Sequence, residues 1–399
     1  MSVWIIEPRD PLIARDGRPF GPTPGIQSNS LSFPFPSTTT GGVRTRAGLV
    51  NGLFDTGKTS AVKKISVRGP LLVQLKSEVN GSELEKWLVP APQDALLFPG
   101  TITNQVQIKR LLPLRVPDDV ETNLKIRGND GLMLVGLCQP DVSGKPAKDA
   151  PQFWYWDTYQ EWLLQPADHT LDPEVLGHNG PQRERRIHVS IDSERLVGKE
   201  GALFGTSGLE FTSGKQHQLS QTRRLALAVA VEDNNSPNLT IDEGLANLGG
   251  ERRAVSWRKS SVDFPACPAE LVDAIVQHRA CRLFLLTPAY FTQGYRPTWL
   301  FDKQNNNVTA HLQALAIQRP QVVSGWDLEK RKPKPTRRLA PAGSVYFLSL
   351  QGTDEAIRSW IRNLWMQCIS DDEQLQRDGF GLAVLGVWSG KPVKMWEEK

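Results

Sequence analysis

The sequence has few of the residues that mark secreted, membrane or metal-binding proteins. Its 399 residues include only 4 cysteines, Cys138, Cys267, Cys281 and Cys368, and none of them forms a CxxC pair. This scatter argues against a zinc ribbon, a redox dithiol or a disulfide framework. The opening residues MSVWIIEPRD mix charges with an apolar run too short for a signal peptide or a membrane span. These absences predict a cytoplasmic protein with reduced cysteines and no membrane contact.

Patterns for catalysis and cofactor binding are absent as well. The sequence contains no HExxH, GxSxG or P-loop pattern. A single histidine such as His188, in the stretch RRIHVSID, is more often a strand residue than a general base. We therefore expect no catalytic residue, no metal site and no cofactor. The six histidines are His169, His178, His188, His217, His278 and His311.

The composition that remains is that of a folded protein with a mild excess of positive charge. Hydrophobic residues make up 39% and charged residues 23%, the formal net charge is +4, and the length suggests two or three domains. Positive charge is concentrated in KRKPKPTRR at residues 330–338, where prolines favour an extended backbone. Such a row of cations can follow a phosphate chain, and it can equally be a solvated surface loop.

A second candidate for anion binding is PSTTTGGVRTR at residues 36–46. We expect its hydroxyls to cap a helix, its glycines to let a phosphate approach the main chain, and its arginines to add charge. The alternative is a well-capped helix whose arginines point to water. The candidate residues are Ser37, Thr38, Gly41, Arg44 and Arg46, and a basic turn suited to single-stranded RNA precedes them with Arg15, Arg18 and Phe20.

Hydrophobic spacing predicts how this helix packs and how the chain is divided. Val43, Ala47, Val50 and Phe54 have helical spacing, so we expect them to form one buried stripe. Alternating helix and strand patterns predict an α+β fold with domains at residues 1–265 and 266–399 and an irregular insertion at about 80–190 in the first.

Two further stretches have both a functional and a structural interpretation. The aromatic segment FWYWDTYQEW in the insertion can stack RNA bases, but we expect it to build a small core. Gly379 and Gly381 belong to a glycine-rich loop that leads into a strand. Such a loop either brings its backbone close to RNA or is simply a tight turn.

A series of motifs along nearly the whole chain resembles the third Cmr subunit, a RAMP superfamily member of type III-B CRISPR effector complexes. The motifs are IEPRDPLIARDGRPF, FPFPSTTTGGVRTRAGL, IHVSID with EGALF, LGGERR, LFLLTPAYF, VSGWDLEKRKPKPTRRLAPAGSVYF and GFGLAVLGVW. The resemblance implies two ferredoxin-like, RRM-related domains. It also implies a non-catalytic chain that caps the 5′ handle of crRNA and docks against the large polymerase-type subunit and the backbone RAMP subunits. Target single-stranded RNA would be an indirect partner.

The resemblance implies RNA-binding residues in both domains. In the first they are Arg15, Arg18, Phe20, Ser37, Thr38, Gly41, Arg44 and Arg46, and in the second they are Trp326, Lys332, Lys334, Arg337, Gly379 and Gly381. Two other functions stay open. Some RAMP relatives process crRNA with a histidine general base near the first helix, whereas the first histidine here is His169. The chain can also be a protein-only scaffold that docks through its aromatic-rich insertion.

Overall fold

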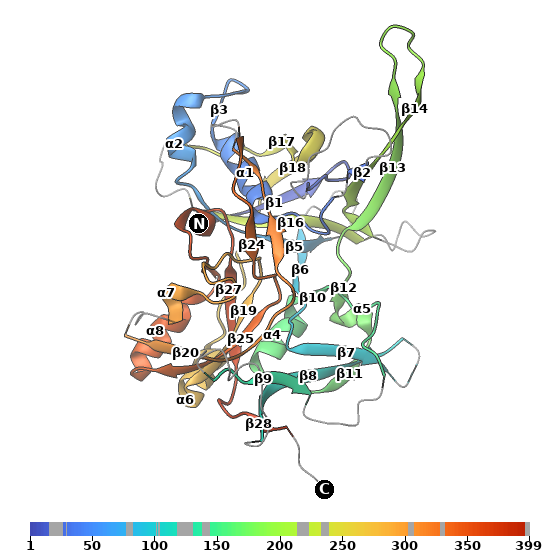
Figure 1. The fold of residues 1–399 in the computed structure, drawn as a ribbon. Coiled ribbons are helices and arrows are strands. Elements are labelled where there is room, and N and C mark those ends of the chain that lie inside the picture. The colour runs from blue at the N-terminus through green and yellow to red at the C-terminus, as the bar shows by residue number, and fades with distance from the viewer. Residues whose placement is uncertain are drawn as a thin grey trace. The chain divides into compact units, whose positions relative to one another are not determined.

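The structure is a computed structural model, and it is shown as a ribbon in Figure 1. It describes residues 1–15, 27–28, 30–76, 83–100, 102, 104–117, 131–137, 144–213, 223–232, 239–301, 307–327 and 332–395. The chain divides into two compact units that interleave along the sequence. Unit 1 comprises Met1–Trp87, Gly180–Asp263 and Val322–Arg337, and unit 2 comprises Leu88–Asn179, Phe264–Gln321 and Arg338–Lys399.

Unit 1 is built on an antiparallel sheet whose strands come from distant parts of the chain. Its strands are β1 (Ser2–Pro8), β5 (Ser66–Leu75), β16 (Arg223–Glu232), β17 (Gly244–Leu248) and β18 (Arg253–Lys259), in the order β5-β16-β1-β18-β17. β1 is central and pairs antiparallel with both β16 and β18. The apolar runs of β1 and β16 are almost wholly buried, as expected of strands inside a sheet.

Helix α1 (Pro36–Ala47) packs against this sheet and contacts β5 and β17. Gly42 allows the close approach, because a Cβ atom there would lie 2.6 Å from Leu248 Cδ1 and 3.2 Å from Trp257. The predicted apolar stripe holds for Val43 and Ala47, which are buried, but Val50 and Phe54 are exposed. The helix ends at Ala47, and the Phe54 ring folds back over Gly48. The stripe prediction was therefore wrong beyond the end of the helix.

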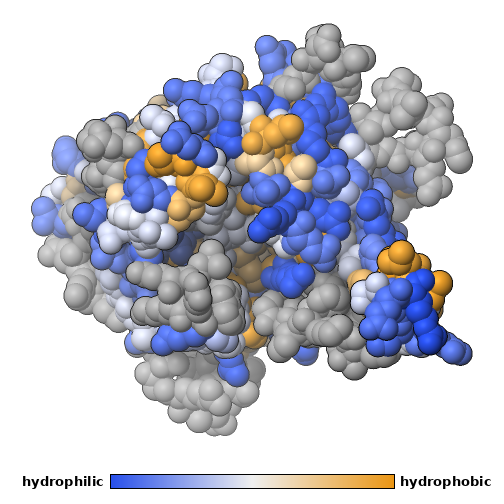
Figure 2. Space-filling view, turned by 90° about the horizontal axis from the view of Figure 1, so that it is seen from above, coloured by the Kyte–Doolittle hydropathy of each residue, from blue (hydrophilic) through white to orange (hydrophobic). Residues whose placement is uncertain are grey.

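A long hairpin extends from unit 1 and is visible at the upper right of Figure 1. It consists of β13 (Gln182–Ile191) and β14 (Gly198–Glu210), and β2 (Gln27–Ser28) pairs parallel with β14. Apolar side chains on the hairpin face solvent, including Ile187 at 81% exposure and Leu203 at 57%. Figure 2, which views the molecule from above, shows hydrophobic residues gathered on this hairpin.

The other elements of unit 1 are short. They are β3 (Leu49–Val50), β4 (Leu53–Phe54), a 3-10 turn at Thr56–Lys58, α2 (Thr59–Val62), β15 (Thr212–Ser213), a 3-10 turn at Gly250–Arg252, β22 (Trp326–Asp327) and β23 (Lys332–Pro333). Three strands, β6 (Leu84–Pro90), β21 (Gln321–Val323) and β24 (Arg337–Leu339), cross the boundaries between the units.

Unit 2 contains a second antiparallel sheet. Its strands are β19 (Ala280–Leu285), β20 (Thr309–Ala316), β25 (Val345–Gln351), β26 (Gln367–Cys368) and β27 (Leu382–Val387), in the order β20-β25-β19-β27-β26. Two amphipathic helices, α6 (Ala269–His278) and α8 (Asp354–Leu364), contact each other and β27. The side chain of Thr353 caps α8 by accepting a hydrogen bond from the Ala356 amide. Two shorter helices are α7 (Thr298–Phe301) and α9 (Glu373–Arg377).

Residues 88–179 form the remainder of unit 2. Their elements are β7 (Ala95–Pro99), β8 (Val106–Arg115), β9 (Leu134–Leu137), β10 (Phe153–Tyr155), α4 (Trp156–Leu164), β11 (His169–Leu171), α5 (Pro173–Leu176) and β12 (Gly177–His178), and β28 (Val393–Lys394) pairs with β8. These regular elements correct the expectation of an irregular insertion. The expected aromatic core is confirmed, since Trp154, Tyr159 and Trp162 are fully buried and Tyr159 meets Phe284 of β19 edge to face.

The two units therefore differ from two consecutive domains at residues 1–265 and 266–399. Most of the segment expected as an insertion in the first domain belongs to unit 2, and Val322–Arg337 belongs to unit 1. Among the helices of the described residues, none has the length and apolar character that crossing a membrane requires.

Candidate nucleic-acid interface

A buried carboxylate on β1 contacts arginines from three parts of unit 1. The Glu7 side chain is 6% exposed and accepts hydrogen bonds from Arg224 of β16 and from Arg258 of β18, the latter at 3.2 Å. Arg9 approaches the same carboxylate to 3.5 Å. Burial lowers the pKa of Arg258, while its hydrogen bond to Glu7 opposes that shift. One carboxylate thus contacts three guanidinium groups.

The LGGERR turn adds a second group of arginines. Gly249 has a φ of +72°, and a Cβ atom there would lie 2.6 Å from the carbonyl oxygen of Ile13, so the turn needs glycine to pack this closely. The turn places Glu251 3.7 Å from Arg15 and 3.0 Å from Arg253. Arg252, which lies between Glu251 and Arg253 in the sequence, is exposed. The chain after β1 runs beside this turn, because the Arg9 amide donates to the Ala254 carbonyl at 2.9 Å.

We call these two groups together the arginine cluster. The cluster contains six arginines and the carboxylates of Glu7 and Glu251, and beside it Asp10 accepts a hydrogen bond from the Ala254 amide at 3.3 Å. Sequence analysis identified only one of its arginines. The others come from segments that are far apart along the chain, and strand pairing brings them together. The six arginines are Arg9, Arg15, Arg224, Arg252, Arg253 and Arg258.

The hydroxyls of α1 do not cap the helix as predicted. The helix begins at Pro36 with Phe35 as N-cap, and no side chain caps it. Ser37 and Thr38 consequently lie in the first turn, and the Thr38 amide already donates to the Phe35 carbonyl at 2.9 Å. Gly41 lies inside the helix, beyond the first turn, where backbone amides are used within the helix. The capping prediction was wrong because proline at the first helical position moves the start forward.

The two arginines of α1 bind protein carbonyls. Arg44 Nη2 donates to the Ile65 carbonyl at 3.0 Å. Arg46 donates to the carbonyls of Asp242, Glu243 and Leu245, at 2.7 Å for Glu243 and 3.2 Å for Leu245. Its guanidinium also lies 6.0 Å from the centre of the Trp257 ring, and burial lowers its pKa. Both arginines therefore hold neighbouring segments on the helix.

The basic segment expected in the second domain belongs to unit 1. Its described part is extended, as predicted, with Trp326 pairing with Pro333 and Asp327 pairing with Lys332. Lys332 and Lys334 are exposed, and the Lys334 amide donates to the Gly325 carbonyl at 2.7 Å. Arg337 begins β24 and is half-buried. This hairpin presents its two lysines to solvent and stays a candidate for phosphate contact.

The glycine-rich loop before β27 is a packed turn. Gly379 and Gly381 have φ of +95° and +86°, which favours glycine. Their amides donate to the carbonyls of Gln376 and Pro288, at 3.0 Å and 2.9 Å. A Cβ atom on Gly381 would lie 2.9 Å from the Ser370 amide nitrogen. These two amides are satisfied inside the protein, so the tight-turn interpretation explains both glycines.

Other predicted features have a more limited structural account. Arg18, Phe20 and the side chain of Trp326 lie outside the described residues. His188 Nε2 lies 2.8 Å from Thr206 Oγ1, and its ring stacks on Phe204 at 5.2 Å. Within the described ranges, no three histidine, cysteine or acidic residues are grouped so that they could hold a metal ion.

The fold and the cluster define an α+β protein with an arginine-rich surface on its first unit. Comparison with known families then identifies it more closely. The chain belongs to the family described as CRISPR-associated protein (Cas_Cmr3), whose model matches residues 4–388. The resemblance noted in the sequence is thereby confirmed, and the chain is a Cmr3-type RAMP subunit of type III-B CRISPR effector complexes.

Solved structures show more distant likenesses. A chain in a cryo-EM structure of the type III-B Cmr-beta complex bound to cognate target RNA is 16% identical, with 95% of each chain covered and a TM-score of 0.45. A chain in the same kind of complex with target RNA and AMPPnP is 15% identical over 91% of this chain and 88% of that one, with a TM-score of 0.42. A chain of a type III-A Csm3-Csm4 subcomplex is 12% identical over 88% and 94%, with a TM-score of 0.33. No curated protein matches the chain.

Proposed function

We propose that this chain is a non-catalytic crRNA-binding subunit that caps the 5′ handle and docks against the large subunit and the backbone subunits of its effector complex. The arginine cluster carries the proposal. Three arginines of the cluster, Arg9, Arg15 and Arg252, are exposed on unit 1. Arginine forks match phosphate geometry, and neutralising phosphates releases counterions, so such a surface favours a sugar-phosphate chain.

The proposed fold is a pair of ferredoxin-like units. In unit 1 the chain order β1, α1, β5, β16, β18 and the sheet order β5-β16-β1-β18 are those of such a unit, with strands two, three, one and four side by side. In unit 2 the strands β19, β20, β25 and β27 follow the same rule, with α8 between the last two. The described part of unit 1 has no second helix between β16 and β18.

The absence of catalysis is part of the proposal. A processing enzyme needs a general base within hydrogen-bond reach of the RNA and near the arginines that hold it. The first histidine of the chain is His169, well beyond the first helix. His188, on the hairpin of unit 1, is engaged with Thr206 and Phe204. These placements favour holding RNA over cutting it.

The docking part of the proposal is supported by the β13–β14 hairpin. Val189 pairs with Leu203 across the strands and Ile187 lies two residues along, so the three side chains share one face. All three are exposed. Exposed apolar groups of this kind on a projecting element are typical of protein interfaces, and a neighbouring subunit of the complex would cover them.

Titration of RNA with purified protein tests the binding role. We expect Arg9→Met/Arg252→Met to weaken binding to a handle-bearing crRNA by at least about tenfold and to reduce the salt-dependence slope by about 2, because each lost phosphate contact removes about one unit. Both side chains are largely exposed, so folding should persist. Arg358→Met is the matched control, since Arg358 lies on α8 of unit 2 and pairs with Asp273 at 2.5 Å.

Three results would contradict the proposal in different ways. Equal affinity and slope for the double variant and the control would remove the arginine cluster from RNA binding. Equal affinity for crRNA with and without the handle would remove the capping role. Specific cleavage of repeat RNA without metal, lost on substitution of one histidine, would show a processing enzyme. Crosslinking of the assembled complex separates the scaffold alternative, which predicts no contact between this chain and the handle.

A further inference from the structure

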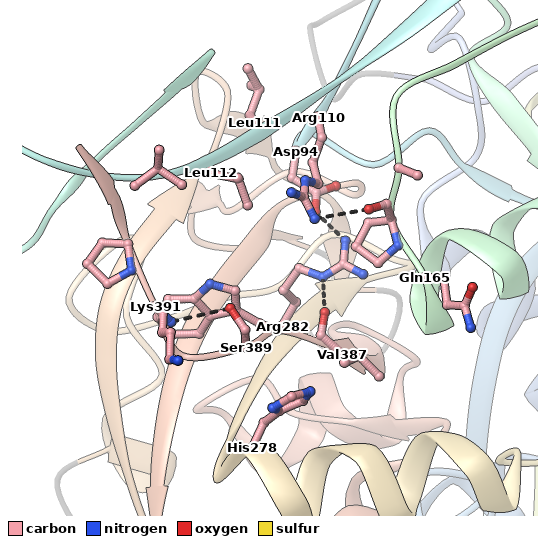
Figure 3. Close-up of a pocket in the computed structure, with 15 residues that line it drawn as sticks. Asp94, Arg110, Leu111, Leu112, Gln165, His278, Arg282, Val387, Ser389 and Lys391 are labelled. Carbon is pink, nitrogen blue, oxygen red and sulfur yellow. Dashed lines mark hydrogen bonds and ion pairs between the residues drawn. The ribbon is translucent and has the colours of Figure 1, made fainter. Parts of the chain in front are cut away.

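Unit 2 contains a cavity that the RNA-binding role does not use. Its volume is about 420 Å³, and residues from β8, from the segment after α4, from β19 and from the chain after β27 line it. Arg110, Arg282, His278 and Lys391, which are labelled in Figure 3, come from different elements and line the cavity. Cavities of about 300–1,000 Å³ are the usual size of small-molecule sites.

One wall of the cavity contains a neutral, fully satisfied ion pair. Asp94 and Arg282 are buried, and Arg282 Nη1 lies 2.6 Å from Asp94 Oδ2. The second carboxylate oxygen accepts from Trp162 Nε1 at 3.0 Å. Arg282 also donates to the carbonyls of Val387 at 2.9 Å and Trp162 at 2.6 Å. This pair gives the wall rigidity but contributes no net charge.

Two other cations line the cavity without a carboxylate of their own. Arg110 Nη1 donates to the Pro166 carbonyl at 3.0 Å. Within the described ranges, neither Arg110 nor Lys391 forms an ion pair with an acidic side chain. Burial lowers the pKa of Arg282, Asp94 opposes this, and the positive charge of Arg110 adds to the lowering. Arg110 therefore lies close enough to Arg282 for their charges to interact.

Trp388 adds a hydrogen-bond donor to the residues that line the cavity. It lines the cavity and is 4% exposed, and among the described residues its indole Nε1 has no hydrogen-bond partner. A buried N–H group without an acceptor is costly, so a ligand oxygen at this donor would be stabilised. Leu112, Pro166 and Val393 provide apolar lining as well.

We propose that this cavity binds a small organic phosphate monoester, with its phosphate between Arg110 and Lys391 and its organic part against the apolar lining. The charges match. The Asp94–Arg282 pair is neutral, so Arg110 and Lys391 leave the cavity with a formal charge of two positive, and a phosphate monoester carries about −1.5 to −2 at neutral pH. The indole N–H of Trp388 is available to a third ligand oxygen or to the ester group.

Calorimetric titration of the full-length protein with phenyl phosphate tests this site. We expect saturable binding that weakens by about tenfold or more in Arg110→Met and in Lys391→Met, because each removes a charge-assisted contact. Arg319→Met is the control, since Arg319 is an exposed arginine of unit 2 that does not line the cavity. It should bind as the unchanged protein does. Phenol, which has the ring without the charge, should not bind.

Several outcomes would overturn the proposal. One is the absence of saturable phenyl phosphate binding, and another is equal affinity in Lys391→Met and Arg319→Met. A third is binding of inorganic phosphate as tight as that of phenyl phosphate, because the apolar lining would then have no role. Thermal unfolding shows whether each variant is folded. Should Arg110→Met fail to fold, Lys391→Met decides, because Lys391 is exposed near the end of the chain. Handle-RNA affinity is measured separately, so the two proposals fail independently.

Discussion

Glu7 is a buried acid in contact with arginines from the end of β1, from β16 and from β18. A carboxylate in this position is costly to bury and is compensated by its hydrogen bonds to Arg224 and Arg258. The arginines depend on Glu7 in turn, since both are mostly buried. Loss of the carboxylate would leave two guanidinium groups facing each other.

We therefore expect Glu7→Gln to lower the free energy of unfolding by about 3 kcal/mol, the typical cost of an uncompensated buried charge. Urea unfolding measures it. Glu251→Gln is the matched control: it removes the same charge from the arginine cluster but at a half-exposed carboxylate, where the cost is about 1 kcal/mol or less. An equal loss in the two variants would show that burial of Glu7 does not set the effect.

At the scale of single residues, sequence patterns predict only part of the arginine cluster. Arg15 is predicted because it lies in a basic turn next to an aromatic residue. The sequence does not predict Arg9, Arg224 and Arg258 as members of the cluster. Their common contact with Glu7 depends on the order of strands in the sheet, and the spacing of residues along the chain does not reveal that order. Arg44 and Arg46 looked available in sequence, but the structure uses them to bind backbone carbonyls.

Two adjacent glycines of helix α1, Gly41 and Gly42, differ in how much space surrounds them. A Cβ atom on Gly41 would have no heavy atom within 4 Å, whereas one on Gly42 would collide with Leu248 and crowd Trp257. Gly41 therefore only lowers helix propensity, while Gly42 lets the helix approach the sheet.

We expect Gly41→Ala to raise the free energy of unfolding by about 0.5–1 kcal/mol, from helix propensity alone, and Gly42→Val to lower it by about 1–3 kcal/mol through overpacking. Chemical denaturation of both variants checks the contrast. Handle-RNA affinity should be unchanged in Gly41→Ala. A drop in affinity with unaltered stability would restore Gly41 as a point of phosphate approach.

Elements were easier to predict than their ends. Alternating helix and strand patterns predict an α+β fold, and the structure has both helices and strands. The start of α1 was missed because hydroxyl residues resemble caps, although Pro36 at the first helical position already begins the helix. Its continuation toward Phe54 was overestimated because apolar spacing alone does not show where a chain turns back.

For the whole molecule, the sequence indicated two α+β units but not how they share the chain. Asp94 and the aromatic residues of α4 complete the core around β19, which lies more than a hundred residues later in the chain. Local sequence patterns do not predict contacts between residues so far apart in the chain. A segment rich in proline and tryptophan therefore resembles an insertion when its contacts with β19 are not known.

The interleaving leads to a prediction about fragments. Residues 266–399 on their own should fail to unfold cooperatively, because Arg282 would lose Asp94 and Phe284 would lose Tyr159. An unpaired buried charge alone costs about 3–5 kcal/mol, a large part of the roughly 5–15 kcal/mol that stabilises a domain.

Fusing residues 88–179 to residues 264–399 through a flexible linker should restore a cooperative thermal transition and a near-ultraviolet circular dichroism signal from ordered tryptophans. Asp94→Asn in that fusion should weaken the transition, whereas Asp354→Asn, at an exposed ion pair with Arg279, should not. A cooperative transition of residues 266–399 alone would show that the second half of the chain has a sufficient core without the segment around Asp94.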